Sequence, residues 1–142
     1  MKSLRIATLA MMVAAPASAQ TFPSSAGSVN IETIARGLDH PWGLAFLPDG
    51  KMLVTERPGR LRVVTRDGKL SPAVTGVPQV RASGQGGLHD VVLDNDFASN
   101  KTIYFCFAEP ASGGGRTAMA RAMASVGPPA ANGTTMVTGR DG

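Results

Sequence analysis

Residues 41–65, P-W-G-L-A-F-L-P-D-G-K-M-L-V-T-E-R-P-G-R-L-R-V-V-T, are the stretch that decides the fold. Apolar residues run in short segments, and each segment ends at a tight turn. Proline presets φ at the first position of such a turn, and glycine accepts the positive φ that follows, so Pro48-Asp49-Gly50 and Arg57-Pro58-Gly59 each predict a reversal of the chain. The stretch therefore predicts antiparallel strands over residues 42–47, 51–56 and 60–65.

The same alternation of short strands and turns continues on both sides. Asn95–Asn100 is typical of a turn, and no helix is predicted before Gly113. Strands recurring at intervals of about eight to twelve residues indicate an all-β sandwich, barrel or propeller, and tight hairpins with four strands per unit favour a β-propeller. The chain holds about two blades, whereas a closed propeller needs at least about four. The further predicted strands cover residues 29–36, 73–77, the run ending at Leu93, 102–108 and 116–122.

The first nineteen residues differ from the rest. Lys2 and Arg5 precede an apolar run over residues 6–15, and the small residues Ala17-Ser18-Ala19 follow it. This layout predicts a secretory signal peptide over residues 1–19, cleaved after Ala19. The apolar run is shorter than the roughly 20 residues that span a bilayer, so we expect no membrane span after cleavage. Export predicts a periplasmic or secreted protein.

Three segments are expected after cleavage: an extended leader over residues 20–28, a body over 29–125 and an irregular tail over 126–142. The tail has neither strand alternation nor a helical period. It is either a disordered tail or the product of a truncation or frameshift. We expect the second, because the predicted β units are too few to close on themselves.

The charge and aromatic content argue against nucleic-acid binding. The formal charge of +4 falls to +2 when Lys2 and Arg5 are removed, and the chain has a single Trp and a single Tyr on which bases could stack. One cysteine cannot form an internal disulfide. Half of the other basic residues are interleaved with Pro, Gly and Asp rather than clustered, namely Arg57, Arg60, Arg62, Arg66, Lys69 and Arg81.

A glycine-rich segment precedes the strand that ends at Leu93. Residues 82–87, A-S-G-Q-G-G, which we call the glycine corner, lead directly into Leu88-His89-Asp90. Glycines allow positive φ and close backbone approach, so Gln85 can be held at a loop tip that faces a ligand. The glycine corner is therefore the candidate small-molecule site.

Several blocks of the sequence resemble one enzyme family. G-L-D-H-P-W-G-L-A-F-L-P-D-G at 37–50, L-V-T-E-R-P-G-R-L at 53–61 and G-Q-G-G-L-H-D-V at 84–91 closely resemble the opening of the soluble glucose/sorbosone dehydrogenases, the aldose sugar dehydrogenases that use pyrroloquinoline quinone (PQQ). The resemblance covers about residues 31–121, and the T-E-R-P-G block followed by G-Q-G-G-L is its specific part. It continues through Gly76-Val77-Pro78, Asp96-Phe97, Tyr104 and Ala108-Glu109.

The resemblance implies a six-bladed β-propeller that carries PQQ over its central channel, calcium that fixes the PQQ, and a sugar docked on top. It implies removal of a hydride from C1 of an aldose to give the lactone, with electrons passed to an external acceptor. Gln85 matches the glutamine of the sugar site, and its amide can both donate to and accept from hydroxyls. The alternative is an amide that only pins its own turn.

His89 is a candidate catalytic base, because imidazole can accept a proton near neutral pH. However, the family's base lies in a His-x-Gly-Gly-Arg-Leu motif that this sequence lacks, so a packing or supporting role is favoured. Turn roles are favoured for His40 and for Asp90, which could bind amides of the corner, and inter-blade core is favoured for Trp42. Asp90, Asp94 and Asp96 lack the spacing of a calcium loop, so no metal ligand is assigned and most PQQ and calcium contacts are expected outside this chain.

The sequence thus predicts the N-terminal part of a PQQ-dependent aldose dehydrogenase, inactive by itself. The alternative is a non-catalytic propeller module that binds sugar or protein. A calcium-dependent lactonase on a similar propeller would need a carboxylate-rich metal site, which this sequence does not display.

Overall fold

The computed structural model describes residues 19–124 and 136–139. The predicted signal peptide, apart from Ala19, and most of the predicted tail lie outside the described residues. The chain divides into two compact units, Met1–Thr33 and Ile34–Gly142, and each is described by itself. Within the described residues, no helix is long and apolar enough to cross a membrane.

The described part of the first unit is a β-hairpin. Strand β1 (Gln20–Ser24) pairs antiparallel with β2 (Gly27–Ile31). Gly27 has a φ of 116° at the turn, and its carbonyl accepts a 2.6 Å hydrogen bond from the Ser24 hydroxyl. The extended leader expected over residues 20–28 contains β1, the turn after Ser24 and the first residues of β2. The predicted strand over 29–36 ends at Ile31.

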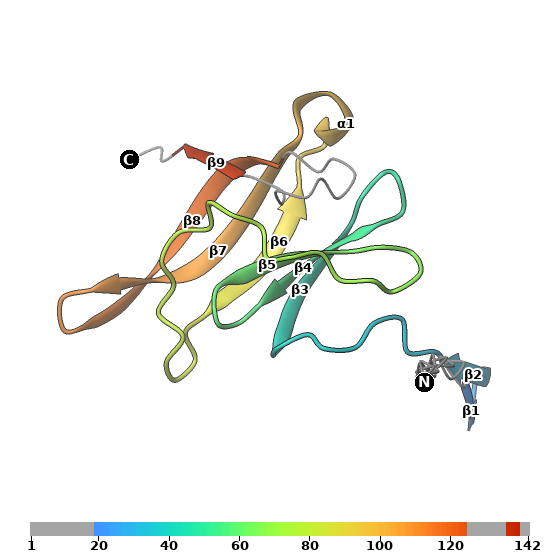
Figure 1. Cartoon of the computed structure of the whole chain (residues 1–142). Coiled ribbons are helices and arrows are strands. Elements are labelled where there is room, and N and C mark those ends of the chain that lie inside the picture. Colours follow the sequence, from blue (N-terminus) through green and yellow to red (C-terminus); the bar gives the residue numbers. More distant parts are fainter. Residues whose placement is uncertain (1–18, 125–135, 140–142) are drawn as a thin grey trace, which may run out of the picture. The chain divides into compact units, whose positions relative to one another are not determined.

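The second unit begins with a three-stranded antiparallel sheet (Figure 1). Its strands are β3 (Pro41–Phe46), β4 (Met52–Glu56) and β5 (Arg60–Val64), joined by the two predicted turns. At the first turn Gly50 has a φ of 80° and its N–H donates 2.8 Å to the carbonyl of Leu47. The turn chemistry of the sequence therefore produces the predicted meander.

A second sheet follows, with four strands in the order of the chain. Strands β6 (Leu88–Leu93), β7 (Thr102–Ala111) and β8 (Gly114–Ala124) form it together with β9 (Met136–Gly139). A single helical turn, α1 (Phe97–Asn100), joins β6 to β7 where the sequence predicted a non-helical turn. Three- and four-stranded antiparallel sheets that follow one another in this way are the blades that the sequence predicted.

Strand β9 corrects the predicted irregular tail. It pairs antiparallel with the end of β8, although residues 126–142 show no strand alternation. An edge strand can be recruited by the backbone hydrogen-bonding groups of its neighbour, which do not depend on side-chain pattern. The prediction of an irregular tail is therefore wrong for residues 136–139.

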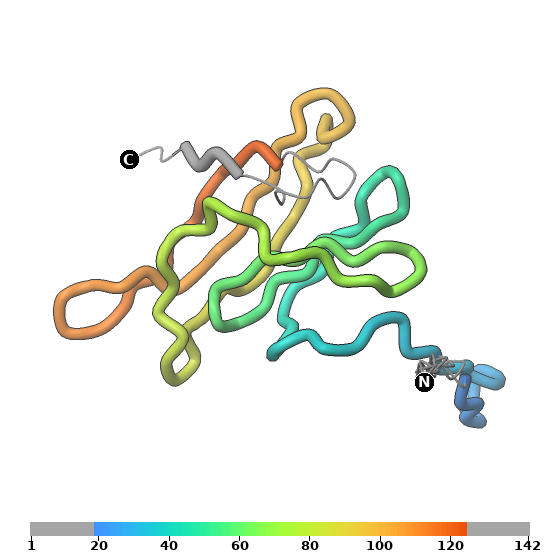
Figure 2. Tube along the Cα trace, viewed as in Figure 1, coloured from blue at the N-terminus to red at the C-terminus, as the bar shows by residue number. Residues whose placement is uncertain are grey.

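The crossover from the first sheet to the second passes along β5 before it reaches the glycine corner (Figure 2). The N–H groups of Ser71 and Val74 donate 2.8 Å bonds to the carbonyls of Val63 and Leu61. Residues 73–77 thus run beside β5 but form no strand, so the strand predicted there is wrong.

The two sheets of this unit share one apolar core. Side chains from β4 and β5 meet those of β6, β7 and β8, and Ile103 is completely buried. Period-two alternation in each strand sends these residues inward. The buried core residues are Leu47, Leu53, Leu61, Val63, Val74, Leu88, Val91, Phe97, Ile103, Phe105, Phe107, Ala120, Ala122 and Ala124.

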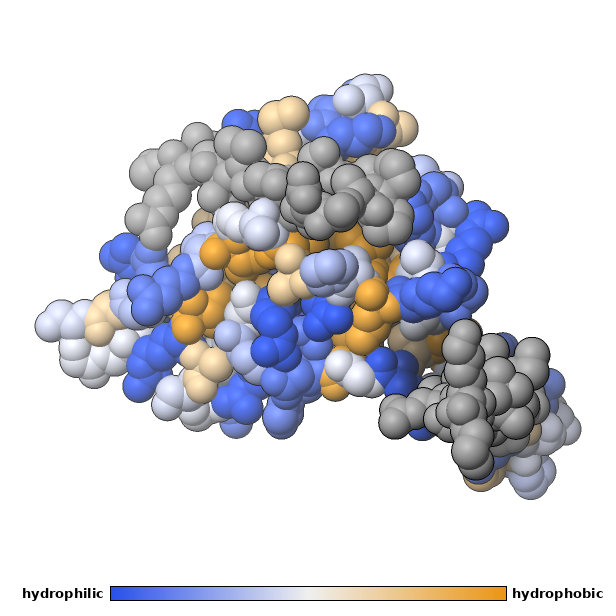
Figure 3. Space-filling view, in the orientation of Figure 1, coloured by the Kyte–Doolittle hydropathy of each residue, from blue (hydrophilic) through white to orange (hydrophobic). Residues whose placement is uncertain are grey.

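Apolar residues also project from the sheets into solvent. Trp42 and Phe46 on β3 are 56% and 71% exposed, and Met119 on β8 is 76% exposed. Figure 3 shows apolar side chains reaching the surface between hydrophilic ones on the face that it draws. Apolar surface of this kind marks regions that pack against another partner or element.

Candidate functional site

The first strand of each sheet, β3 and β6, carries an irregularity at the end nearest the glycine corner. In β3, Trp42 and Gly43 together oppose Thr55 of β4. In β6, His89 and Asp90 lie at the corresponding break in the pairing with β7. A bulge adds twist and re-aims side chains, and bulges are common beside active sites.

The two bulges contact one another. The Trp42 and His89 rings stack with centroids 5.1 Å apart and planes 30° from parallel. Buried Thr55 joins the strands, because its hydroxyl accepts a 2.8 Å bond from the Gly43 N–H and donates a 2.5 Å bond to the His89 carbonyl. A Cβ on Gly43 would lie 2.7 Å from Asp90 Oδ1, so only glycine fits there.

Arg57 holds the glycine corner from the neighbouring sheet. Its Nε donates a 3.0 Å bond to the Gly86 carbonyl, and its Nη2 donates to the Gly84 carbonyl. The Arg57 carbonyl accepts a 3.0 Å bond from the Leu88 N–H, and a Cβ on Gly87 would lie 2.5 Å from Arg57 Cγ. One arginine therefore spans the corner on both sides of Gln85.

Gln85 lies at the exposed tip of this corner. No hydrogen bond joins its side-chain amide to any residue that the structure describes, although its backbone carbonyl lies 3.2 Å from His89 Nε2. The Gly86 N–H donates a 2.9 Å bond to the Ser83 carbonyl, which closes the turn through backbone groups. The Gln85 amide does not pin its own turn and remains available to a ligand.

Glu56, next to Arg57, is fully buried and binds the segment that leads into β3. It accepts 2.6 Å bonds from the Asp39 N–H and from Arg60 Nε. Burial raises the pKa of the Glu56 carboxyl, but these bonds and the charges of Arg60 and Arg62 lower it, and the net pKa lies below the ordinary value. Glu56 is therefore a charged structural anchor and not a poised general acid.

The structure places the other predicted residues as follows. His89 lies on β6 with its ring stacked on that of Trp42, and its supporting role stays a prediction. The Asp90 carboxylate accepts a 3.0 Å bond from the Val91 N–H, and not from the corner as predicted. His40 occupies a bend with a φ of 49°. Trp42 is exposed, so it does not belong to the core between these two sheets.

Arg57 and Thr55 are the residues to which the sequence assigned no role. Both belong to the T-E-R-P-G block, which was recognised only as part of a resemblance. Each of its first three residues binds a different segment: Thr55 binds both bulges, Glu56 binds the entry to β3, and Arg57 binds the glycine corner. The succession of this block and the corner, which is the specific part of the resemblance, was the available signal.

At the opposite end of β6, Asp94–Lys101 form a turn that we call the aspartate turn. The Asp94 carboxylate accepts bonds of 2.9, 2.8 and 2.9 Å from the Asp96 N–H, the Asn100 amide and the Tyr104 hydroxyl. These bonds, that of Asp96 foremost, lower the pKa of Asp94. The described residues contain no group of three or more His, Cys, Asp or Glu side chains placed to hold a metal. They do not fit a calcium ion.

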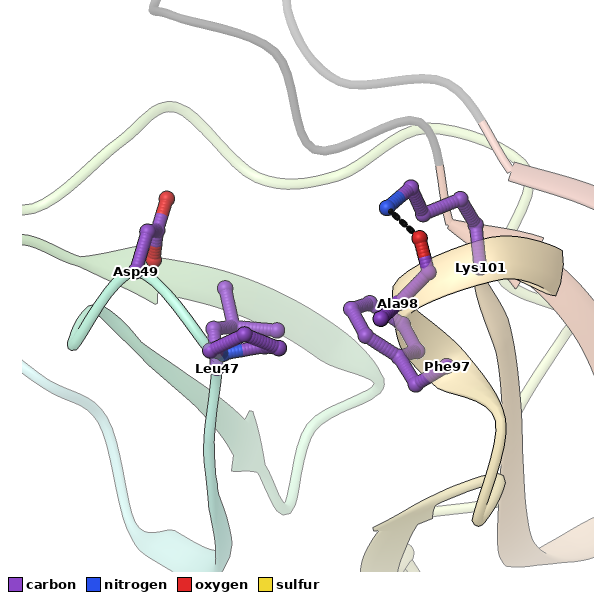
Figure 4. A pocket seen from close by; sticks show the side chains of 6 residues that line it. Leu47, Asp49, Phe97, Ala98 and Lys101 are labelled. Carbon is purple, nitrogen blue, oxygen red and sulfur yellow. Dashed lines mark hydrogen bonds between the residues drawn. The ribbon is translucent and has the colours of Figure 1, made fainter.

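A hollow of about 160 Å³ lies beside the aspartate turn (Figure 4). Leu47 and Phe97 face each other across it, and Lys101 Nζ donates to the carbonyl of Ala98 at its rim. Asp49 is paired with Lys51 at 2.8 Å. Both charged groups of the hollow are thus satisfied by the protein, which distinguishes it from the exposed, unpaired amide at the glycine corner.

Comparison with known proteins decides the family. The model of the glucose/sorbosone dehydrogenases matches residues 38–138, most of the chain, and this range extends into the predicted tail. The chain belongs to the glucose/sorbosone dehydrogenase family. Among its relatives is the aldose sugar dehydrogenase YliI of Escherichia coli, with 51% identity over 83 residues, which cover 58% of this chain and 22% of the relative.

Solved structures of glucose/sorbosone dehydrogenases are similar to this chain. The apo form of the soluble aldose sugar dehydrogenase from Escherichia coli shares 44% identity at a TM-score of 0.62, covering 66% of this chain and 27% of that one. The PQQ-bound aldose sugar dehydrogenase from Streptomyces coelicolor shares 29% identity at a TM-score of 0.65, covering 88% and 35%. The fold is all-β, and the chain is similar to part of these β-propeller dehydrogenases.

The chain spans 23% and 22% of the length of two curated relatives and 29% of another glucose dehydrogenase structure.

The described residues do not form a binding site for PQQ. One face of the Trp42 ring is covered by His89, and the Arg57 guanidinium is engaged by carbonyls of the corner. What the residues present can do is offer an amide to a polar ligand at a rigid corner.

Proposed function

We propose that this chain is the N-terminal part of an exported quinoprotein that oxidises the C1 hydroxyl of an aldose to the lactone, with PQQ as cofactor, calcium to hold it and an external electron acceptor. Gln85 contacts the sugar. By itself the chain is inactive, because the described residues supply neither the proton-accepting histidine motif of the family nor a metal cage.

The observation that carries the proposal is the geometry of Gln85. Its amide is exposed and unpaired among the described residues, yet the carbonyls on either side of it are bonded to Arg57. A sugar hydroxyl both donates and accepts, and a primary amide offers both functions. Holding that amide before the ligand arrives reduces the entropy that binding costs.

The exposed apolar side chains on β3 and β8 support the view that this chain is one part of a larger propeller. Trp42, Phe46 and Met119 project from the sheets. Blades of a propeller bury such side chains against the next blade. Reading the gene beyond the codon for Arg121 in three frames tests this. Further blades with a His-x-Gly-Gly-Arg-Leu motif would support the proposal, and their absence from every frame would contradict it.

Binding measurements separate the proposal from a non-catalytic module. The chain is dialysed against PQQ with and without calcium, titrated with D-glucose through the emission of its single Trp, and assayed for glucose oxidation with a dye. We expect no turnover, and a response to glucose that Gln85→Ala abolishes. Sugar binding without any effect of PQQ or calcium would favour the binding module. Glucose oxidation by a monomeric chain would contradict the claim that it is inactive alone.

A further inference from the structure

Three consecutive carbonyls of the glycine corner are bonded to side chains outside it. Arg57 donates to Gly84 and Gly86, and His89 Nε2 lies 3.2 Å from the carbonyl of Gln85 between them. A carbonyl oxygen can only accept, so the bond to Gln85 requires a proton on Nε2. The backbone on each side of the Gln85 side chain is therefore held by Arg57, and its own carbonyl by His89.

Arg57 is itself fixed at its backbone. Its N–H donates a 3.0 Å bond to the His40 carbonyl, and its carbonyl accepts a 3.0 Å bond from the Leu88 N–H. Gly87 lies against its side chain so closely that a Cβ there would be 2.5 Å from Arg57 Cγ. Residues next to both sheets therefore hold the backbone of Arg57, and this fixes the position from which its guanidinium binds the corner.

The chemistry of arginine suits this task in a way that lysine does not. The guanidinium presents several N–H donors in one rigid plane, so that Nε and a terminal nitrogen can bind two acceptors at a set separation. The two acceptors here belong to residues on either side of Gln85. A lysine ammonium has the same charge but lacks this planar fork, so it would hold one carbonyl and release the other.

We propose that Arg57 is a positioning residue, which fixes the glycine corner so that the Gln85 amide is presented to the sugar. The sugar contact rests on the proposed function, whereas the fixing of the corner does not. Arg57 acts through Gln85 and does not touch the substrate.

Hydrogen exchange of the intact chain, followed by mass spectrometry at low micromolar concentration, tests the fixing of the corner. Arg57→Lys keeps the charge and the backbone bonds. We expect exchange in a peptide covering the corner and Leu88 to accelerate about tenfold, while β7 stays unchanged. The matched control is Arg81→Lys. Arg81 is exposed on the other arm of the corner, and its guanidinium has no hydrogen bond to the described residues.

The exchange result decides whether Arg57 fixes the corner. Unchanged exchange at the corner in Arg57→Lys would overturn it. Equal acceleration at the corner and in β7 would also overturn it, because that result describes a loss of global stability and not of local order. Acceleration confined to the corner, with Arg81→Lys behaving as the wild type, would support it.

Glucose titration then separates positioning from the proposed function. Trp42 stacks on His89 beside the corner and is the only tryptophan, so its emission reports on this end of the sheets. We expect Arg57→Lys to weaken glucose binding about tenfold and Arg81→Lys to leave it unchanged. Equal affinity in Arg57→Lys and the wild type would overturn the proposal. If the wild-type chain gives no saturable response with or without PQQ and calcium, the sugar contact fails, and exchange alone decides the role of Arg57.

Discussion

The glycine corner and the aspartate turn lie at opposite ends of the same strand, β6, and are stabilised in different ways. The aspartate turn is held from within and by its own hairpin partner, because Asp94 binds Asp96, Asn100 and Tyr104. The glycine corner is held largely from another sheet, by Arg57, which is 27 and 29 residues away from the carbonyls it binds. One turn is locally self-sufficient, and the other depends on tertiary structure.

The difference shows where a ligand can be accommodated. A turn whose polar groups satisfy one another has none left for a ligand, as at the aspartate turn. At the glycine corner the carbonyls are satisfied by Arg57 and His89, which leaves the Gln85 side chain exposed and unpaired among the residues described. Support from a second element makes a loop rigid without using the side chain at its tip.

The largest expected effect comes from Gly87→Ala. The added Cβ would lie 2.5 Å from Arg57 Cγ and 2.8 Å from the Arg57 carbonyl, so the corner and its support must separate. We expect a loss of about 2 kcal/mol in the free energy of unfolding, measured by chemical denaturation. The matched control is Gly114→Ala on β8, where no heavy atom lies within 4 Å of the new Cβ. Equal losses in the two variants would contradict the dependence of the corner on Arg57.

A smaller effect, with a pH dependence, is expected from Asp94→Asn. The hydrogen bonds from Asp96, Asn100 and Tyr104 lower the pKa of Asp94 below 3.8, so the folded state binds this proton less readily than the unfolded state. The carboxylate therefore stabilises the fold above pH 3.8, and this contribution is lost as the pH falls through the lowered pKa. The unfolding temperatures of the variant and the wild type should converge in acid.

Arg57→Lys is the contrasting variant for that titration. The acceptors of the Arg57 side chain are backbone carbonyls, which gain no proton in acid, so the difference of this variant from the wild type should persist over the same pH range. Convergence of Arg57→Lys, or a constant offset for Asp94→Asn, would show that the two ends of β6 are not held as described.

The smallest effect is expected from Lys101→Gly in the aspartate turn. Lys101 has a φ of 54°, a conformation that costs a residue with a Cβ more than it costs glycine. We expect the free energy of unfolding to rise by about 0.5 kcal/mol, since relief of the backbone strain is partly offset by loss of the bond from the Lys101 side chain to the Ala98 carbonyl.

Gly84→Ala in the glycine corner is the opposite change. It places a Cβ at a φ of 57° in open space, and the free energy of unfolding should fall by about 1 kcal/mol. Shifts of the denaturation midpoint in the same direction for Lys101→Gly and Gly84→Ala would contradict this comparison.

Much of the fold follows from the sequence. Pro48-Asp49-Gly50 and Arg57-Pro58-Gly59 determine their own turns through residues that are neighbours in the chain, so the three-stranded meander was predictable. The alternation in β7 likewise places Ile103, Phe105 and Phe107 on the buried face. Gln85 was also visible at this level, because glycines on both sides of a polar residue indicate an exposed tip.

Other features depend on contacts between distant segments. Strand β9 pairs with the edge of β8, and residues 73–77 run beside β5, to which the Val74 N–H is bonded, without forming a strand. The partnership of Arg57 with the glycine corner, and the contact of the two bulges through Thr55, join residues that are far apart in the chain. Local propensity carries no information about such pairs. The sequence determined the strands of the three-stranded meander, their turns and the exposed amide, whereas only the tertiary structure decided what holds that amide in place.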